Sequence, residues 1–411
     1  MPITSRNEIS QKDNMPLAGF IGLVLPSILA TIALCALAAM LVQRTAFYRR
    51  EVDAELAANR FHSIDGLRGL LAIAVLYHHA VISYFFYATG RWDVPPSRLA
   101  TLFGQGGVAM FFMVTALLFW SRALSTGGRL NLQQFFRSRA RRIVPMYVVS
   151  VGALIITALA LTHFRLNNSP MQVAKDISAW LLFTFPGTPD INGLRNTGLI
   201  NTVYWTLVYE WKFYLLFPLM VLFASRRLAW VLLIVSAVLI GWYSANGIEW
   251  YFVGGVLVAT LLVQYPELAK PVRGAFGSVL VFALLAAILR SVSTAYDPMA
   301  AVLFFAVFFI IASGNTLFGI LTSKPVRLLG MVSYSIYLSH NFVLYLTFRL
   351  VNHFKDVATL TVPAFWLVTA AASVLVVLLS ALTYRYVEFP FLAGSESKRL
   401  SSAQAAPAVR V

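Results

Sequence analysis

The stretch "DGLRGLLAIAVLYHHA", residues 65–80, has the composition of a membrane-spanning helix, yet it contains four ionisable side chains. Asp65, Arg68, His78 and His79 lie among leucines, valines and alanines. An Asp or Arg in the middle of a bilayer costs roughly 2.5–3.5 kcal/mol on insertion scales. Ionisable side chains in such a helix therefore indicate a functional role or a specific partner.

The composition of the whole chain supports the membrane interpretation. Of 411 residues, 59% are hydrophobic and 12% are charged, and the mean hydropathy is +0.76. A soluble domain carries about 25% charged residues. The net charge of +16 comes from basic residues in short segments between apolar runs. Such residues set the orientation of membrane helices, which explains the charge better than nucleic-acid binding does. The single Cys35 lies in an apolar run, which excludes a disulfide framework and a thiolate metal site.

Eleven apolar runs are candidates for membrane-spanning helices. They lie near 17–43, 66–88, 101–121, 143–162, 203–224, 228–244, 248–264, 276–290, 298–313, 329–348 and 360–384. The first run is too long for a signal peptide, so we interpret it as a retained anchor with its N-terminus outside. Alternating sides from there places 20 basic residues inside and 10 outside, in agreement with the positive-inside rule. We therefore expect an all-α, polytopic membrane protein of about eleven helices with a cytoplasmic C-terminus.

The longest outside segment, 163–202, has its own apolar stretch, "DISAWLLFTFPG". This stretch is too short to span a bilayer, so we expect it to lie at the interface or to re-enter the membrane. It is also the expected docking place for an extracytoplasmic substrate.

A line of polar side chains follows one face of the helix expected at 66–88. Arg68 and His79 are 11 positions apart, which puts them within about 20° of the same face and ~16 Å apart along the axis. Asp65 can share that face, whereas His78 points elsewhere. The alternative is that Asp65 and Arg68 are ordinary helix-start and snorkelling charges and that His79 is a hydrogen-bonded core residue.

Glu210 is a candidate partner for His79. It lies well inside an apolar span, ~10 Å below the outer edge, and His79 lies ~20 Å above the inner edge of a core ~30 Å thick. The two depths agree, and a carboxylate beside an imidazole forms an acid–base pair. Glu210 can instead pair with Lys212 or Tyr214.

Two further segments carry polar groups of interest. The first is "LLGMVSYSIYLSHN", residues 328–341, in which His340 lies ~15 Å inside its helix and Tyr334 adds a hydroxyl. A role in the site and structural hydrogen bonding between helices explain these polar side chains equally well. The basic loop "FFRSRARRIVPMY", residues 135–147, contains Arg139 and Arg142, which suit either phosphate binding or topogenic and lipid contacts. No metal-ligand spacing is present, so we expect no metal site.

Several motifs together resemble the membrane-bound acyltransferase 3 family, from about Ser63 to Pro390. Arg68 and His79 match its Arg-x10-His signature, and "GGVAMFFMVTALLF" is similar to another family segment, although Thr115-Ala116 departs from the usual Ser-Gly. Further similarities are the Arg-x-x-Arg of Arg139 and Arg142, "YWTLVYEWKFY" with Trp205 and Glu210, "SYSIYLSH" with Tyr334 and His340, and "VEFP" with Glu388 and Pro390. The family core usually has ten helices, so the helix near 17–43 is an additional one.

The resemblance implies an O-acyltransferase that moves an acyl group, most simply acetyl, from cytoplasmic acyl-CoA to a hydroxyl of an envelope glycan or lipid-linked sugar. Its catalytic residues would be His79, Glu210, Arg68 and Asp65. Arg68, Arg139 and Arg142 would bind the donor, and Trp205, Tyr334 and His340 would support the site. No bound cofactor and no nucleic-acid partner are expected. The alternative is a transporter or flippase that moves a glycan, lipid or anion without acyl chemistry.

The resemblance also divides the chain. Residues 1–60 would hold an N-terminal tail, the extra helix and a basic cytoplasmic linker, 61–392 the membrane acyltransferase domain, and 393–411 a disordered cytoplasmic tail. The expected location is the inner membrane of a bacterium. Because the sequence ends at Val411, we expect acyl transfer in the membrane or on a separate partner. The sequence does not identify the acceptor, the acyl chain length or the oligomeric state.

Overall fold

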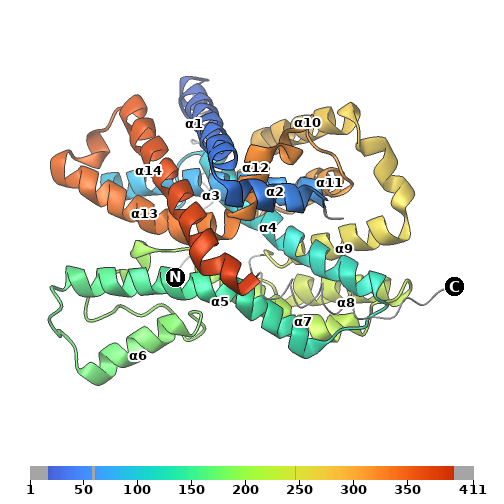
Figure 1. Cartoon of the computed structure of the whole chain (residues 1–411), viewed down its shortest axis with the longest axis horizontal. Coiled ribbons are helices and arrows are strands. Elements are labelled where there is room, and N and C mark those ends of the chain that lie inside the picture. The colour runs from blue at the N-terminus through green and yellow to red at the C-terminus, as the bar shows by residue number, and fades with distance from the viewer. Residues whose placement is uncertain (1–16, 58–60, 246, 393–411) are drawn as a thin grey trace. The chain divides into compact units, whose positions relative to one another are not determined.

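The structure, a computed structural model, describes residues 17–57, 61–245 and 247–392, and within these ranges it is built from helices without strands (Figure 1). The predicted disorder of residues 393–411 concerns a segment outside these ranges. The described residues divide into two compact units, one within 17–110, 271–330 and 346–374, and the other within 111–270, 331–345 and 375–392.

The first unit contains the N-terminal helices and most of the later ones. Its elements are α1 (Leu17–Arg44), α2 (Ala46–Ala57), α3 (His62–Thr89), the start of α4 (Arg98–Ser125), α10 (Ala275–Ser291), α11 (Pro298–Ala312), η4 (Ile320–Thr322), α12 (Lys324–Met331), the end of α13 (Ser333–Phe354), η5 (Val357–Thr359) and the start of α14 (Val362–Thr383). Helix α3 lies at its centre, with most of its residues from Ser63 to Ser83 buried.

The second unit contains the middle of the chain. Its elements are the end of α4, α5 (Leu132–Leu161), α6 (Pro170–Leu181), η2 (Thr197–Ile200), α7 (Trp205–Val221), α8 (Leu228–Tyr243), α9 (Trp250–Gln264), η3 (Pro266–Val272), the start of α13, the end of α14 and the π-helical turn η6 (Tyr384–Glu388). A buried cluster on α5, α6, α7 and α13 forms its core around Tyr147, Trp180 and Tyr204.

Helices form at all eleven places where the hydropathy predicts them, but fewer are long enough to cross a bilayer. Within the described ranges, the helices that satisfy both length and composition are Gly22–Arg44, His62–Thr89, Arg98–Ser125, Leu132–Leu161 and Val362–Leu392. The pair Trp250–Gln264 and Pro266–Val272 would be a sixth, bent by 101°. Of the other helices at these places, α7, α8, α10 and α11 have 15 to 17 residues, or about 22–26 Å, against a hydrocarbon core ~30 Å thick. Helix α13 has 22 residues and is long enough, but its composition is not sufficiently apolar.

The prediction of a basic loop at 135–147 is wrong, because this segment belongs to α5. The Asn131 side chain accepts from the Gln134 amide at 2.9 Å and caps the helix there, and arginine is a good helix former. A high density of charge shows only that a segment is polar and does not distinguish a loop from a helix. The run expected at 329–348 is likewise interrupted at Val332, between α12 and α13.

The first turns of α3 pack at very short range against the segment that ends in α12. A Cβ on Gly66 would lie 1.9 Å from the Leu321 carbonyl oxygen, and one on Gly330 would lie 1.9 Å from the Asp65 carbonyl oxygen. Only glycine permits this approach, and such small-residue contacts are typical of helix packing in membranes. The backbone around Asp65 is therefore held tightly.

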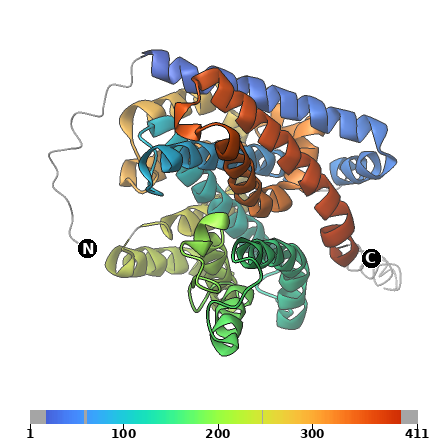
Figure 2. The same ribbon diagram turned by 90° about the vertical axis from the view of Figure 1, so that its left-hand side faces the viewer.

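The additional helix α1 packs on the first unit through both apolar and polar contacts. The Thr31 and Tyr77 hydroxyls lie 3.2 Å apart, and the Trp366 indole donates to the Gly22 carbonyl at 3.0 Å. Figure 2 shows α1, in blue, beside the first part of α14, in red. Helix α1 is thus an integral part of this unit.

The segment 163–202 of the second unit is ordered by its own polar contacts. The Asn192 side chain, which is fully buried, accepts from the Asn167 amide at 2.8 Å and donates to the Thr162 hydroxyl and the Arg165 carbonyl at 2.9 and 2.7 Å. The stretch "DISAWLLFTFPG" forms the end of α6 and then a turn in which Phe183 and Thr184 have positive φ. The segment therefore has a defined shape.

Candidate active site

His79 is a half-buried side chain on α3, and its ring is held in one orientation. Its Nδ1 lies 3.1 Å from the Val75 carbonyl oxygen. Because a carbonyl only accepts, Nδ1 carries the hydrogen, and the lone pair of the neutral ring lies on Nε2. The ring also stacks on Trp92, with centroids 6.4 Å apart and planes at 25°. Trp92 lies in the loop after α3, where no periodic pattern predicts a contact with His79.

His78 has a different environment, as its position on the helix predicts. It is buried, and its Nδ1 lies 2.7 Å from the Ala100 carbonyl oxygen. A Cβ on Gly104 would lie 2.2 Å from this ring, so the histidine fills the space that the glycine leaves on α4. His78 is a packing residue between α3 and α4.

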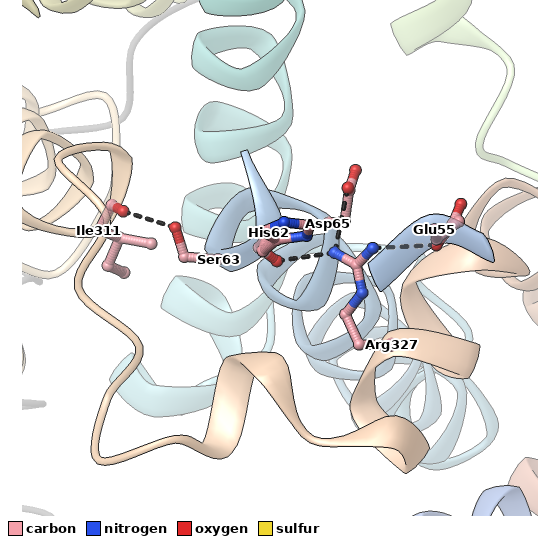
Figure 3. Close-up of polar contacts among 6 residues, drawn as sticks. All are labelled: Glu55, His62, Ser63, Asp65, Ile311 and Arg327. Atoms are coloured by element: carbon pink, nitrogen blue, oxygen red, sulfur yellow. Dashed lines mark hydrogen bonds and ion pairs between the residues drawn. The ribbon is translucent and has the colours of Figure 1, made fainter. Parts of the chain in front are cut away.

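Asp65 and Arg68 mark the other end of the polar line on α3. The Asp65 carboxylate accepts from Nη1 of Arg327 on α12 at 3.1 Å, and Arg327 is fully buried (Figure 3). Arg68 is half-buried, as His79 is, in a stretch of α3 that is otherwise mostly buried. The common exposure of Arg68 and His79 agrees with their predicted common face. Arg327 lies 262 positions away in the chain, and no local sequence pattern predicts it as the partner of Asp65.

In the second unit, Glu210 on α7 accepts a short hydrogen bond from the hydroxyl of Tyr214 on the next turn. This was one of the two local alternatives to pairing with His79. Arg139 on α5 interacts with the same hydroxyl, and its guanidinium lies over the Phe119 ring, 4.8 Å from the centroid. One polar group is thus formed by Glu210, Tyr214 and Arg139, next to the aromatic ring of Phe119.

Arg142 lies one helical turn further along α5 and belongs to a second polar group. Its Nη1 lies 3.2 Å from the Glu388 carboxylate, and its guanidinium lies 5.5 Å from the centroid of the Tyr334 ring. The Tyr334 hydroxyl donates to the Ile143 carbonyl at 3.0 Å, and Ser335 donates to Glu388. The charges of Glu210 and Glu388 both act on Tyr334, so the two groups are neighbours.

The remaining supporting residues have different surroundings. His340 is fully buried, its Nδ1 lies 3.1 Å from the Ile336 carbonyl oxygen, and its ring contacts Tyr337. Trp205 is 42% exposed and contacts Tyr209 edge-on. Trp205 is thus the most exposed of these side chains.

The candidate residues therefore form two sets, one in each unit. Asp65, Arg68 and His79 follow α3 in the first unit. Arg139, Arg142, Glu210 and Tyr334 gather in the second. The predicted pairing of His79 with Glu210 joins the two units and stays a prediction. Within the described ranges, no group of three or more His, Cys, Asp or Glu side chains is arranged to hold a metal ion.

Comparison with known proteins supplies the class of protein that carries these residues. The sequence model of the acyltransferase domain of the acyltransferase 3 family matches residues 61–385, and the chain belongs to this family. It is 26% identical over 378 residues to the peptidoglycan O-acetyltransferase OatA of Listeria monocytogenes, covering 80% of this chain and 55% of that protein.

Two other relatives are another O-acetyltransferase and an exopolysaccharide production protein. The chain is 23% identical over 367 residues to the O-acetyltransferase OatA of Staphylococcus aureus, covering 80% of this chain and 56% of that protein. It is 28% identical over 262 residues to the exopolysaccharide production protein ExoZ of Rhizobium meliloti, covering 59% of this chain and 77% of that protein. The chain thus spans about half the length of the two OatA proteins. No solved structure matches it.

Proposed function

We propose that this protein is an O-acyltransferase of the bacterial inner membrane that moves an acyl group, most simply acetyl, from cytoplasmic acyl-CoA to an envelope glycan or lipid-linked sugar. Membership of the acyltransferase 3 family supports the reaction class. The OatA and ExoZ relatives, named for peptidoglycan O-acetylation and for exopolysaccharide production, support a polymer of the envelope as the acceptor class.

The single observation that carries the proposal is the geometry of His79. Its Nδ1 bond to Val75 directs the basic nitrogen Nε2 away from the helix backbone, and the ring is only half-buried. A general base needs its lone pair within hydrogen-bond reach of the proton that it removes. The opposite tautomer, with its hydrogen on Nε2, could not donate to the Val75 carbonyl and would have no lone pair on Nε2.

The proposed reaction balances with His79 alone as the base. Nε2 takes the proton of the acceptor hydroxyl while the oxygen attacks the thioester carbonyl. The tetrahedral adduct then expels the CoA thiolate, the C–S bond breaks, and the thiolate takes the proton from the imidazolium. The products are the O-acyl ester and free CoA. The alternative is a covalent acyl-histidine: Nε2 attacks the thioester carbonyl and the CoA thiolate leaves, after which the acceptor oxygen attacks the acyl-imidazole, the C–N bond breaks and the acceptor proton passes to the thiolate.

The donor side of the proposed site consists of Arg68, Arg139 and Arg142, whose guanidinium groups suit the phosphates of acyl-CoA. The ion pair of Arg142 with Glu388 is compatible with this role, because a guanidinium has five N–H donors and one carboxylate does not use them all. The Phe119 and Tyr334 rings hold the planes of Arg139 and Arg142.

Further roles follow from the surroundings of the other candidates. Glu210 would orient His79, and Trp205, Tyr334 and His340 would support the helices around the substrates. The ordered segment 163–202 would receive the acceptor from outside. In this arrangement the N-terminus lies outside and the C-terminus in the cytoplasm, which the distribution of basic residues supports.

Purified full-length protein in lipid vesicles, given acetyl-CoA labelled in the acetyl group and soluble peptidoglycan fragments, tests the proposal. We expect release of free CoA and labelled ester, both abolished in His79→Ala. His78→Ala is the matched control, since it removes the neighbouring imidazole but leaves His79 intact. Movement of the fragments across the vesicle membrane without release of CoA would instead support a transporter or flippase.

A further inference from the structure

Helix α2, which precedes the region matched by the acyltransferase family, contributes a carboxylate to a buried ion cluster on the first unit. Nη1 of Arg327 donates to the Asp65 carboxylate at 3.1 Å and to the His62 carbonyl at 2.9 Å, and Nη2 donates to the Glu55 carboxylate at 3.2 Å. Figure 3 shows Glu55 and Asp65 bound to different nitrogens of the guanidinium. We call these groups the Arg327 cluster.

Because Arg327 is buried, its positive charge and its N–H groups depend on both carboxylates, Glu55 and Asp65, for compensation. Its side chain is 0% exposed, and the side chains of Asp65 and Glu55 are 10% and 20% exposed. A buried guanidinium needs hydrogen bonds for its N–H groups and nearby negative charge. Removing one partner of such a group leaves donors without acceptors, which is far more disruptive than removing a surface pair.

A second ion pair joins the same two helices and provides a natural contrast. Lys324 on α12 lies 2.8 Å from Asp53 on α2, and the two side chains are 54% and 50% exposed. Surface pairs of this kind contribute little because water screens them. On α2, Glu55 continues the buried face of Tyr48 and Val52 at a spacing of i, i+4 and i+7, whereas Asp53 points to solvent.

The Arg327 cluster lies directly at the part of α3 that carries Arg68. Asp65 is one turn before Arg68, and its backbone is already fixed by the close approach of Gly330. The Ser63 hydroxyl donates to the Ile311 carbonyl at 2.8 Å and ties the same turn to α11. Glu55 completes this set of contacts from outside the family domain.

We propose that Glu55 is a positioning residue: through Arg327 and Asp65 it fixes the first turns of α3 and thereby presents Arg68 to the phosphates of the acyl donor. The role of Arg68 in this statement rests on the proposed function. The additional N-terminal helices are then part of the donor site's support, because α1 and α2 hold Glu55 against α12.

Two variants of the full-length protein, Glu55→Ala and Asp53→Ala, test the proposal. Both remove one carboxylate from α2, change the net charge equally and leave a residue that favours helix. Loss of a charged hydrogen bond corresponds to roughly a tenfold change in an equilibrium. We therefore expect Glu55→Ala to raise the KM for acetyl-CoA by about tenfold, with kcat and the KM for the acceptor within about twofold of the parent. Asp53→Ala should match the parent in all three.

Hydrogen exchange of the amides of residues 62–68 gives a readout that does not depend on activity. We expect faster exchange there in Glu55→Ala and parent-like exchange in Asp53→Ala. Equal exchange in the two variants would overturn the proposal. Faster exchange without a change in donor KM would also overturn it, because Glu55 would then be a structural residue only.

An Arg68→Ala variant separates this proposal from the proposed function. A parent-like donor KM in Arg68→Ala would refute the donor role of Arg68, and with it the statement that Glu55 acts on the donor through Arg68; faster exchange in Glu55→Ala would then show only that Glu55 fixes the first turns of α3. A raised donor KM in Arg68→Ala, together with identical behaviour of Glu55→Ala and Asp53→Ala, would refute the role of Glu55 alone.

Discussion

His79 and His340 have the same local geometry in different surroundings. In both, Nδ1 lies 3.1 Å from the carbonyl oxygen four residues earlier, so both neutral rings hold their lone pair on Nε2. His79 is half-buried beside Trp92, whereas His340 is fully buried beside Tyr337. The hydrogen bond therefore sets the tautomer of both rings, and exposure distinguishes the proposed base from the supporting residue.

The largest expected effect distinguishes the two histidines directly. His79→Ala should lower the transfer rate by about 10²–10⁴-fold, the usual contribution of a positioned acid or base. His340→Ala should mainly lower the thermal stability, because it removes a buried side chain and leaves a cavity. Rates per folded molecule, measured as CoA release, check this. A loss as large in His340→Ala as in His79→Ala would break the comparison.

The next effect concerns Glu210, the proposed partner of His79. Glu210→Gln keeps the shape and removes the charge, and we expect the transfer rate to fall by about 10²-fold. Tyr214→Phe removes only the hydroxyl that bonds Glu210 and should have a smaller effect on the rate. Transfer rates of the two variants at equal protein concentration give the answer. A larger loss in Tyr214→Phe would mean that Glu210 acts through the tyrosine and not on the histidine.

A smaller effect is expected for Trp92, the ring that stacks on His79. A contact between two such rings contributes about 0.5–1.5 kcal/mol, so Trp92→Ala should lower the transfer rate by roughly tenfold or less. Tyr337→Phe, beside His340, keeps the ring contact and should leave the rate near the parent value. Steady-state kinetics of both variants test this. An unchanged rate in Trp92→Ala would show that the stacking does not orient His79.

The smallest effect on the rate is expected at His78. Because it packs between α3 and α4 against Gly104, His78→Ala should lower the midpoint of thermal unfolding while the rate per folded molecule stays within about twofold of the parent. Thermal unfolding and CoA release, measured on the same preparation, separate the two quantities. A transfer rate reduced as far as in His79→Ala would contradict the assignment of His78 to packing.

The sequence predicted features that depend on local periodicity. The 100° step of a helix places Arg68 and His79 on one face and turns His78 away, and the exposure of the three residues agrees with this. Long apolar runs likewise predicted the positions of the helices. The hydroxyl of Tyr214 was named as a possible partner of Glu210 because i, i+4 residues meet on a helix.

Features that depend on distant parts of the chain were not predicted. The ion pair of Asp65 with Arg327 joins residues 262 positions apart, and neither periodicity nor composition indicates such a contact. The helical path of α5 through 135–147 was missed because a high charge density was read as a loop. The ends of the shorter helices were predicted only approximately, because hydropathy does not indicate where the last turn ends: the run 203–224 is longer than α7, whereas the run 276–290 is one residue shorter than α10 at each end.

Chemical rescue of His79→Ala by free imidazole tests the central claim most directly. The variant lacks only the side chain proposed as the base, so a small imidazole that enters the vacated space can take its place. We predict that transfer by His79→Ala, assayed as CoA release, rises with imidazole concentration, and that the parent and His340→Ala show no such rise. Transfer by His79→Ala at the parent rate without imidazole would contradict the account.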